Sequence, residues 1–285
     1  MGGPLVSVVI ATRNSARTLP YALASLRWQT FRDFEVIVVD NYSVDGTRDI
    51  ARRYGARVYV CGDERSRQRN YGASMARGEY LYFMDSDFIL HRQVLEESVS
   101  LASKGADAVI IKNISYPGIS RVARARFYER LSYIGSGAYE VARFIRRDIF
   151  YRVDGYDESL YANEDYDLYL RLIRAGARIG WTKISYELHI GEPSDLKEFI
   201  IKNYYYGYSL KKYFKKTGNA LHALPLRHTY LRKDIVSTLA RRWPLGLIYI
   251  PLLRITQGLS VLVGMINKSH KQNDVRMKPC KNRPL

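Results

Sequence analysis

The segment from residue 69 to residue 87 constrains the fold most strongly, because in it a strand-length apolar run ends at two carboxylates. Residues 80–84 are an unbroken apolar and aromatic run, the pattern of a strand covered on both faces. Asp85 and Asp87 follow at its carboxyl end, where open α/β sheets bind ligands. Two carboxylates one residue apart are costly to bury unpaired, but they suit Mg²⁺ or Mn²⁺ together with phosphate oxygens. The segment predicts a site for a divalent cation and its phosphates, with a solvated turn as the alternative.

Strands and helices alternate along the first part of the chain. The predicted strands are residues 6–11, 34–39 and 56–60, and the predicted helices are residues 16–29 and 47–54. This alternation is typical of a doubly wound, mostly parallel α/β sheet. Such a sheet places Asp40 and Asp85 on one rim, and the polar residues Thr12 and Asn14 close the first strand.

Five motifs follow one another in the first two thirds of the chain: SVVIATRN, a helix that ends in Trp28-Gln29-Thr30, FEVIVVDNYSVDGT, RNYGASMARGEYLYFMDSD and GYDESLYANEDYDLYLRL. In this order and spacing they resemble the signatures of inverting, family-two nucleotide-sugar glycosyltransferases with the GT-A fold. The resemblance implies a GT-A catalytic domain over residues 1–190, which would transfer a sugar from a nucleotide donor with inversion at the anomeric carbon.

The resemblance also implies a role for each polar residue at the strand ends. Asp40 would hydrogen-bond the base or ribose of the nucleotide, and Thr12 and Asn14 would belong to the same nucleotide-sugar site. Asp85 would hold the ribose or the donor sugar, and Asp87 would hold the cation that bridges the two phosphates. Mn²⁺ or Mg²⁺ is the expected cofactor, because the leaving nucleoside diphosphate develops negative charge that a Lewis acid stabilises.

Glu164 and Asp165 are the candidates for activating the acceptor. An inverting transfer needs a base that takes the proton of the acceptor hydroxyl, and a carboxylate within hydrogen-bond reach can do this. By the resemblance, Asp165 is the base and Glu164 is a supporting residue. Both side chains could also stabilise the amino end of a helix predicted over residues 166–175.

Four further side chains are candidates for binding the donor or the acceptor. Arg69 precedes the Asp-x-Asp strand and would supplement the cation at the diphosphate, unless it lies on a solvated helix face. His189 follows a predicted strand and would assist the cation or the diphosphate, unless it is structural. Cellulose-synthase-like relatives have a Gln-x-x-Arg-Trp motif that contacts diphosphate and acceptor. A partial match, with Leu239 in place of the glutamine, assigns these roles to Arg242 and Trp243, and a snorkelling pair is the alternative.

The net charge of +17 predicts an anionic partner or surface. No helix-turn-helix, zinc-finger or aromatic RNA-binding signature accompanies this charge, so nucleic acid is not the expected partner. Basic residues instead gather in residues 121–130 and beside the tyrosines of residues 204–216. This combination suits an anionic membrane surface, with solvated helix faces as the alternative.

Residues 245–266 form a 22-residue, mostly apolar stretch whose single charge is Arg254. The length could span a bilayer, but Arg254 makes insertion marginal, and basic flanks on both sides favour a cytoplasmic position for both ends. We expect a re-entrant or interfacial helical pair broken between residues 251 and 258, with one transmembrane helix or a soluble core helix as alternatives. The expected organisation beyond the catalytic domain is amphipathic interfacial helices over residues 191–243, a membrane-embedded segment over residues 244–267 and a basic cytoplasmic tail over residues 268–285.

A lipid-linked acceptor would explain the active site and the membrane segment together. We expect a hexose to be moved to a polyprenyl- or dolichyl-linked acceptor in glycan or glycoprotein assembly. By analogy with relatives that share a short membrane appendage, the expected donor is GDP-mannose, and UDP-glucose is the alternative. A nucleotide-sugar-binding protein without catalytic activity is the alternative from a different class.

The start of the chain has no basic segment followed by a long apolar stretch, so we expect the catalytic domain on the cytoplasmic side of the cell membrane. Cys61 and Cys280 lie far apart in the sequence and fit neither a metal motif nor a disulfide framework. A reducing compartment is the simpler interpretation of these two cysteines.

Overall fold

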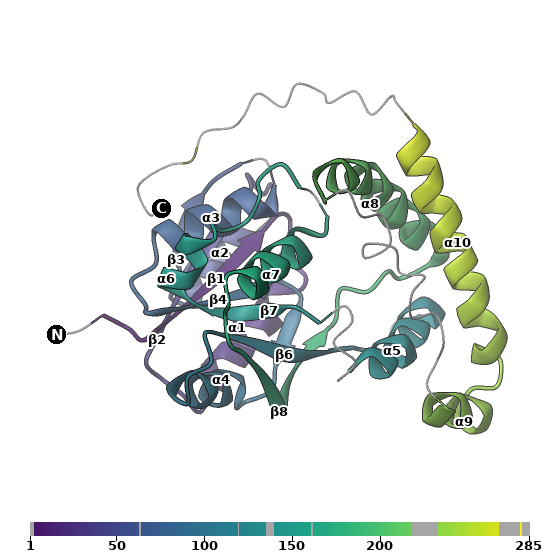
Figure 1. Cartoon of the computed structure of the whole chain (residues 1–285), viewed down its shortest axis with the longest axis horizontal. Helices are drawn as coiled ribbons and strands as arrows, with labels where there is room; N and C mark the ends of the chain where they lie inside the picture. Colours follow the sequence, from purple (N-terminus) through teal and green to yellow (C-terminus); the bar gives the residue numbers. More distant parts are fainter. Residues whose placement is uncertain are drawn as a thin grey trace.

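A mixed β-sheet forms the centre of the computed structural model, which describes residues 3–62, 64–118, 120–134, 140–160, 162–217, 233–267 and 280 (Figure 1). The strands are β1 (Val6–Thr12), β2 (Phe34–Asp40), β3 (Arg57–Val60), β4 (Tyr80–Asp85), β5 (Phe88–Leu90), β6 (Ala108–Ser115), β7 (Ala142–Arg146) and β8 (Ile179–His189). The helices are α1 (Leu19–Arg27), α2 (Thr47–Arg53), α3 (Arg65–Ser74), α4 (Val94–Ser103), α5 (Arg121–Tyr133), α6 (Arg147–Arg152), α7 (Glu164–Arg174), α8 (Leu196–Thr217), α9 (Lys233–Arg242) and α10 (Gly246–Ile266).

The first four strands form the parallel half of the sheet, whose order is β3-β2-β1-β4-β7-β6-β8-β5. The register pairs Thr12 with Asp40 and Ala11 with Asp85, so the carboxyl ends of β1, β2 and β4 lie level. In the other half β7 pairs antiparallel with β4 and β6, and β5 pairs antiparallel with β8. Strands β6 and β8 pair parallel with each other. The α/β fold with a mostly parallel first half is therefore confirmed, and a half with mixed pairing extends it.

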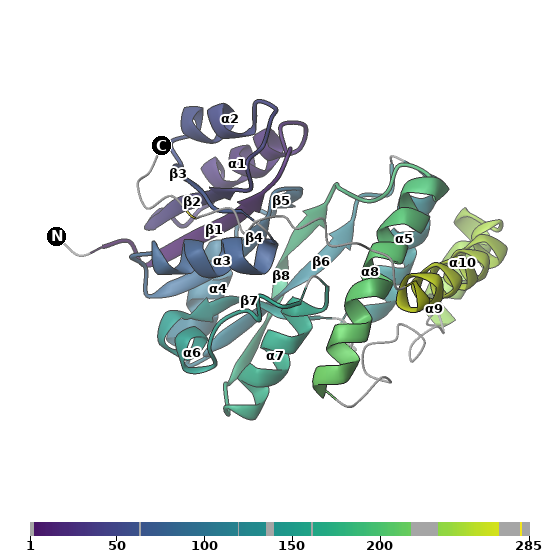
Figure 2. The same cartoon turned by 90° about the horizontal axis from the view of Figure 1, so that it is seen from above.

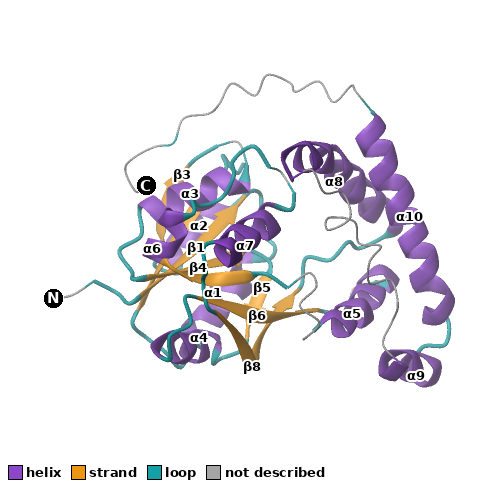
Figure 3. Cartoon of the chain, in the orientation of Figure 1, coloured by secondary structure: helices purple, strands orange, loops and turns teal. Residues whose placement is uncertain are grey.

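Helices cover both faces of this sheet (Figure 3). Successive side chains of a strand point to opposite faces, so Val8 of β1 packs in a core with residues of α1, α2 and α4. Val9 packs in a second core, to which α3, α6 and α7 contribute. Burial on both faces explains why β1 and β4 appear in the sequence as continuous apolar runs.

Helices α5, α8, α9 and α10 lie to one side of the sheet, and α10 is the outermost of them in both views (Figures 1 and 2). The amide of Gln257 on α10 donates a 2.9 Å hydrogen bond to Asn203 on α8. Four residues further along each helix, Gly207 of α8 is packed against the main-chain carbonyl of Val261. Helices α8 and α10 therefore lie in close contact with each other.

Helix α10 is continuous from Gly246 to Ile266 with Pro251 inside it, so the predicted break between residues 251 and 258 is wrong. Its one charged residue, Arg254, is mostly buried and forms ion pairs and hydrogen bonds within the protein, to Glu129 of α5 and to Gln257. Of the described helices, α10 is the one whose length and composition would allow it to cross a membrane. By sequence alone, Arg254 is an unpaired charge that opposes insertion of this segment into a bilayer. In the structure this charge is paired with Glu129.

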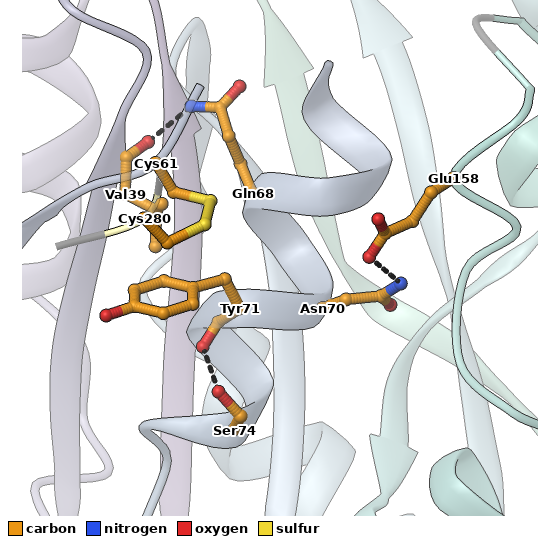
Figure 4. The surroundings of a disulfide bond; sticks show 8 residues. All are labelled: Val39, Cys61, Gln68, Asn70, Tyr71, Ser74, Glu158 and Cys280. Carbon is orange, nitrogen blue, oxygen red and sulfur yellow. Dashed lines mark hydrogen bonds between the residues drawn. A yellow bond between two sulfur atoms is a disulfide. The ribbon is translucent and has the colours of Figure 1, made fainter. Parts of the chain in front are cut away.

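A disulfide joins Cys61, directly after β3, to Cys280, with Cα atoms 4.0 Å apart (Figure 4). Cys61 is fully buried in a small core with Ile37 and Val39 of β2. The expectation that the two cysteines form no disulfide is therefore wrong. A separation of 219 residues gives no local signal for such a bond. Disulfides are rare in reducing compartments. The two cysteines therefore no longer support the expectation that the protein lies in a reducing compartment.

Candidate active site

Thr12, Asn14 and Asp40 meet at the carboxyl ends of β1 and β2. The carboxylate of Asp40 is fully buried and accepts hydrogen bonds from the Thr12 hydroxyl at 3.1 Å and from the backbone N–H of Ser43 at 2.9 Å. The backbone N–H of Asn14, a residue with a φ of 50°, donates to the Ser43 hydroxyl at 2.7 Å. These contacts fix the two strand-end loops against each other, and the nucleotide role of the three residues stays a prediction.

A second cluster joins Asp85 of β4 to the amino end of α7. The guanidinium of Arg69 on α3 donates to Asp85 at 2.6 Å, to Asp165 at 2.9 Å and to Glu164 at 3.2 Å. Arg143 on β7 approaches the second oxygen of Asp85 at 3.0 Å and of Asp165 at 3.4 Å. The two arginines therefore hold the carboxylates of Asp85 and Asp165 together, although these lie 80 residues apart by number in the sequence.

The electrostatics of this cluster keep both aspartates ionised at neutral pH. Burial raises the pKa of Asp85, but the guanidiniums of Arg143 and Arg69 outweigh it and hold the pKa well below its usual range. Burial likewise raises the pKa of Asp165, and the same two arginines lower it below the ordinary value. Asp165 is 21% exposed at its side chain, and Asp85 is 28% exposed. The site therefore presents an ionised, partly accessible carboxylate that is able to accept a proton.

Arg143 and Glu187 belong to this site although sequence reasoning missed both. Arg143 sits on a short strand that pairs with β4, and the sequence presents it as one charge in an apolar run. Glu187 is fully buried on β8 and accepts hydrogen bonds from the Tyr82 hydroxyl at 2.7 Å and from Asn113 at 3.1 Å. Burial raises the pKa of the Glu187 carboxyl. The available signal was a single acidic residue in a strand, which is too common to identify a site.

Asp87 and His189 lie together at the turn between β4 and β5. Because β5 pairs with β8, His189 is brought opposite Phe88, and its Nε2 lies 3.1 Å from the Asp87 carboxylate. Burial lowers the pKa of His189, but the carboxylates of Asp87 and Glu192 together outweigh burial, so the pKa lies above its ordinary value. The backbone of Gly191 packs against the same carboxylate, so a Cβ at this position would collide with Asp87. The space for this carboxylate thus depends on a residue without a side chain.

These two side chains fit a divalent cation held partly by substrate. Among the described residues no group of three or more His, Cys, Asp or Glu side chains converges to hold a metal ion. Asp87 and His189 offer one oxygen and one nitrogen ligand. Mg²⁺ and Mn²⁺ in phosphoryl sites commonly use one or two protein ligands, with phosphate oxygens and water for the rest.

Arg242 and Trp243 have contacts other than the carboxylates of Asp85 and Asp165. Trp243 is 9% exposed and packs between the rings of Tyr128 and Tyr249 in the core shared by α5, α9 and α10. Arg242 is exposed at the end of α9. In the part of the chain that the structure describes, no hydrogen bond or ion pair connects either side chain to Asp85 or Asp165. Their predicted roles stay predictions, and Trp243 has a packing role.

Comparisons with known proteins identify the family. The model of the family "Glycosyl transferase family 2" matches residues 7–154. Glycosyltransferase AglE from Haloferax volcanii is 26% identical over 247 residues, which are 81% of this chain and 77% of that protein. The uncharacterized glycosyltransferase RT0329 from Rickettsia typhi is 26% identical over 195 residues, and the match covers 61% of this chain but only 60% of that protein.

Solved structures agree on the fold. The mannosyltransferase PcManGT from Pyrobaculum calidifontis, in complex with GDP-Man and Mn²⁺, has a TM-score of 0.63 at 19% identity, over 91% of this chain and 87% of that one. TarS 1–349 from S. aureus, in complex with UDP-GlcNAc, has a TM-score of 0.54 at 18% identity, over 92% and 88% of the two chains. The family model spans more than half of this chain, and these neighbours share its sheet and helices. The chain belongs to glycosyltransferase family 2.

Proposed function

We propose that this family 2 glycosyltransferase inverts the anomeric carbon of a nucleotide-linked hexose as it transfers the sugar to a lipid-linked acceptor. The observation that carries the catalytic part is the pair of ionised carboxylates, Asp85 and Asp165, on either side of Arg69 and Arg143. Asp85 binds the sugar or ribose of the donor, and Asp165 takes the proton of the acceptor hydroxyl. Arg69 and Arg143 compensate the negative charge of the two carboxylates.

Asp87 and His189 would hold Mn²⁺ or Mg²⁺ at the diphosphate. Bound there, the cation supplies Lewis-acid stabilisation of the leaving nucleoside diphosphate. Asp87 provides the charge and His189 the neutral ligand, while Thr12, Asn14 and Asp40 order the loop that receives the nucleotide. A nucleotide-sugar-binding protein without activity would need Asp85 for the donor, but it would have no use for Asp165 as a proton acceptor.

We propose mannose from GDP-mannose as the donor, and a polyprenyl or dolichyl phosphate or a glycan on it as the acceptor. PcManGT, whose fold is similar, binds GDP-Man with Mn²⁺. A second candidate is a UDP-sugar donor, because TarS with a related fold binds UDP-GlcNAc. The discriminating experiment is a thermal-shift series with GDP-mannose, UDP-glucose and UDP-GlcNAc, each with Mn²⁺ and with EDTA, followed by turnover on a short polyprenyl phosphate. A Mn²⁺-dependent stabilisation by GDP-mannose alone supports the proposal. Stabilisation by a UDP-sugar alone would contradict GDP-mannose as the donor and support the UDP-sugar instead.

The membrane part of the proposal rests on the exposed face of α10. Ile248, Leu252, Ile255, Leu259 and Leu262 recur every three or four residues along one side of the helix and are between 52% and 65% exposed. The opposite side packs on α5, α8 and α9, so lipid cannot surround the helix while it keeps these contacts. An apolar stripe on a protein with a net charge of +17 fits a helix that lies in the plane of an anionic membrane. We therefore propose that α10 docks on the membrane surface, with a transmembrane position as the alternative.

Flotation with lipid vesicles tests this assignment. Leu252→Glu together with Ile255→Glu places two charges on the exposed stripe without touching the buried side of α10. The matched control is Ile184→Glu, which changes a residue that is 68% exposed on β8. We expect the double variant to lose binding to vesicles with anionic lipid while the control floats like the unchanged protein. Equal flotation of both variants would contradict a role of the stripe in docking.

A further inference from the structure

Glu192 is a buried carboxylate beside the Asp87 and His189 pair, in the loop after β8. It is 4% exposed and lies 3.0 Å from Nδ1 of His189. The same oxygen accepts a 2.6 Å hydrogen bond from Ser115 of β6 and lies 3.1 Å from the guanidinium of Arg130 on α5. These partners come from three different elements, so the position of the carboxylate is well determined.

The geometry divides the two nitrogens of His189 between two carboxylates. Nδ1 lies 3.0 Å from Glu192 and 3.3 Å from the guanidinium of Arg130, and Nε2 faces Asp87 at 3.1 Å. Because a guanidinium has no acceptor, Glu192 is the group of the two that can accept a proton from Nδ1. A carboxylate or carbonyl on one imidazole nitrogen fixes the tautomer and the ring orientation, which leaves the other nitrogen to bind a metal ion. The ring of Phe88 packs edge-on against the His189 ring with centroids 5.4 Å apart and restricts its rotation further.

Positive charge from α5 holds Glu192 in place. Arg130 is bound to it directly, and Arg126 lies 3.8 Å from its second oxygen. Arg126 also pairs with Glu129, which in turn pairs with Arg254 of α10. Buried ion pairs of this kind also occur without any functional role, so the charge pairing alone does not identify one. The role is indicated by the third partner, His189, which lies between Glu192 and the Asp-x-Asp motif.

We propose that Glu192 is a positioning residue of the donor site, which orients His189 so that Nε2 points at the cation beside Asp87. This inference rests on the proposed function, in which Asp87 and His189 hold the cation. Glu192 itself does not touch the cation or the diphosphate. It fixes the protonated nitrogen of the imidazole, and it raises the basicity of the nitrogen that binds the metal ion.

The test is a double-mutant cycle of Glu192→Gln and His189→Ala, read as the Kd for Mn²⁺ by electron paramagnetic resonance with GDP present. Loss of such a supporting partner typically weakens metal binding about 10- to 100-fold, and we expect this for Glu192→Gln alone. In the His189→Ala background we expect Glu192→Gln to change the Kd less than about 2-fold, because the ring that it orients is gone. The affinity for GDP in EDTA should be equal in all four proteins.

Glu35→Gln is the matched control for structural damage. Glu35 is 9% exposed, binds Arg57 and Arg77, and lies at the amino end of β2. Its loss should lower thermal stability without changing the Kd for Mn²⁺. If Glu192→Gln fails to give a cooperative melt, Glu192→Asp keeps the charge, draws the carboxylate away from Nδ1, and should raise the Kd in the same way.

The outcomes separate the two proposals. An unchanged Kd in Glu192→Gln, or an equal increase in both backgrounds, overturns the positioning role while cation binding at His189 stands. An unchanged Kd in both His189→Ala and Asp87→Ala overturns the proposed cation site and the inference with it.

Discussion

Replacement of Arg69 by Met should destabilise the protein because it leaves three carboxylates with too little positive charge. Arg69 is 1% exposed, and its guanidinium contacts Asp85, Asp165 and Glu164. Methionine is a similarly long, unbranched side chain, so the change removes charge and hydrogen bonds more than packing volume. Arg143 continues to pair with the two aspartates in the variant, and Arg65 continues to pair with Glu164 at 2.6 Å.

The expected cost follows from burial. Removing one partner of a buried ion pair costs about 3–5 kcal/mol of the free energy of unfolding. The side chains of Asp85 and Asp165 are 28% and 21% exposed, so they are only partly buried. We therefore expect a cost at the lower end of this range, about 3 kcal/mol. For a chain of this size, each kcal/mol lowers Tm by roughly 2–4 °C, which gives a decrease of roughly 6–12 °C at pH 7.

The pH dependence has a definite sign. Asp85 and Asp165 have pKa values lowered by folding, so their contribution to stability is present above the unfolded pKa and is lost as the pH falls through the folded values. The difference in Tm between the two proteins should therefore be full at pH 7 and narrow below about pH 4. In the Arg69→Met background Asp165→Asn should stabilise the protein, whereas in the unchanged protein it should destabilise it. A Tm within about 2 °C of the unchanged protein at pH 7 would refute this account of the cluster.

Three further expectations concern the cation, the helix contact and the membrane face. Asp87→Ala should abolish the Mn²⁺-dependent part of donor binding in thermal-shift titrations, since one neutral ligand cannot hold a hydrated cation and the diphosphate together, and unchanged Mn²⁺-dependent turnover would contradict the assignment. Gly207→Ala should cost about 1–3 kcal/mol in denaturant unfolding, because the added Cβ meets the carbonyl of Val261. Gly258→Ala, where a Cβ meets nothing within 4 Å, should instead stabilise α10 by up to about 1 kcal/mol; equal effects would refute the close contact of α8 and α10. The Leu252→Glu and Ile255→Glu protein should keep the Tm of the unchanged protein within a few degrees, since both positions are more than half exposed, and a large loss of Tm would mean that the stripe packs on protein.

The sequence predicts the parallel half of the fold because its signals are local. Buried parallel strands are continuous apolar runs, and the residues that end them, such as Asp40 and Asp85, lie on one rim by the geometry of the sheet. Arg143 could not be predicted in the same way. It reaches the carboxylates only because β7 pairs antiparallel with β4, and no short-range pattern encodes that pairing.

The carboxyl-terminal helix shows the same limit. Pro251 removes a backbone hydrogen bond and favours a break, yet α10 is continuous because its buried side packs along α8 and α5. Arg254 appears in the sequence as a charge that opposes burial, and the structure neutralises it with Glu129, which lies far away in the sequence. Tertiary contacts of this kind also explain why the pairing of Cys61 with Cys280 was missed.

Turnover of the Asp165→Asn protein tests the central claim most directly, because the claim assigns to the ionised carboxylate of this residue the proton of the acceptor hydroxyl. The measurement compares the rate of transfer from GDP-mannose to a short polyprenyl phosphate with the affinity for GDP-mannose and Mn²⁺ in the same protein. We expect the rate to fall about 10²- to 10⁴-fold, the usual contribution of a general base, while donor affinity changes less than about 3-fold. Nuclear magnetic resonance of the product of the unchanged protein should show the β-linkage expected from an inverted α-linked donor. A rate in Asp165→Asn within about 2-fold of the unchanged protein, or a product with retained configuration, would contradict the assignment of Asp165 as the base.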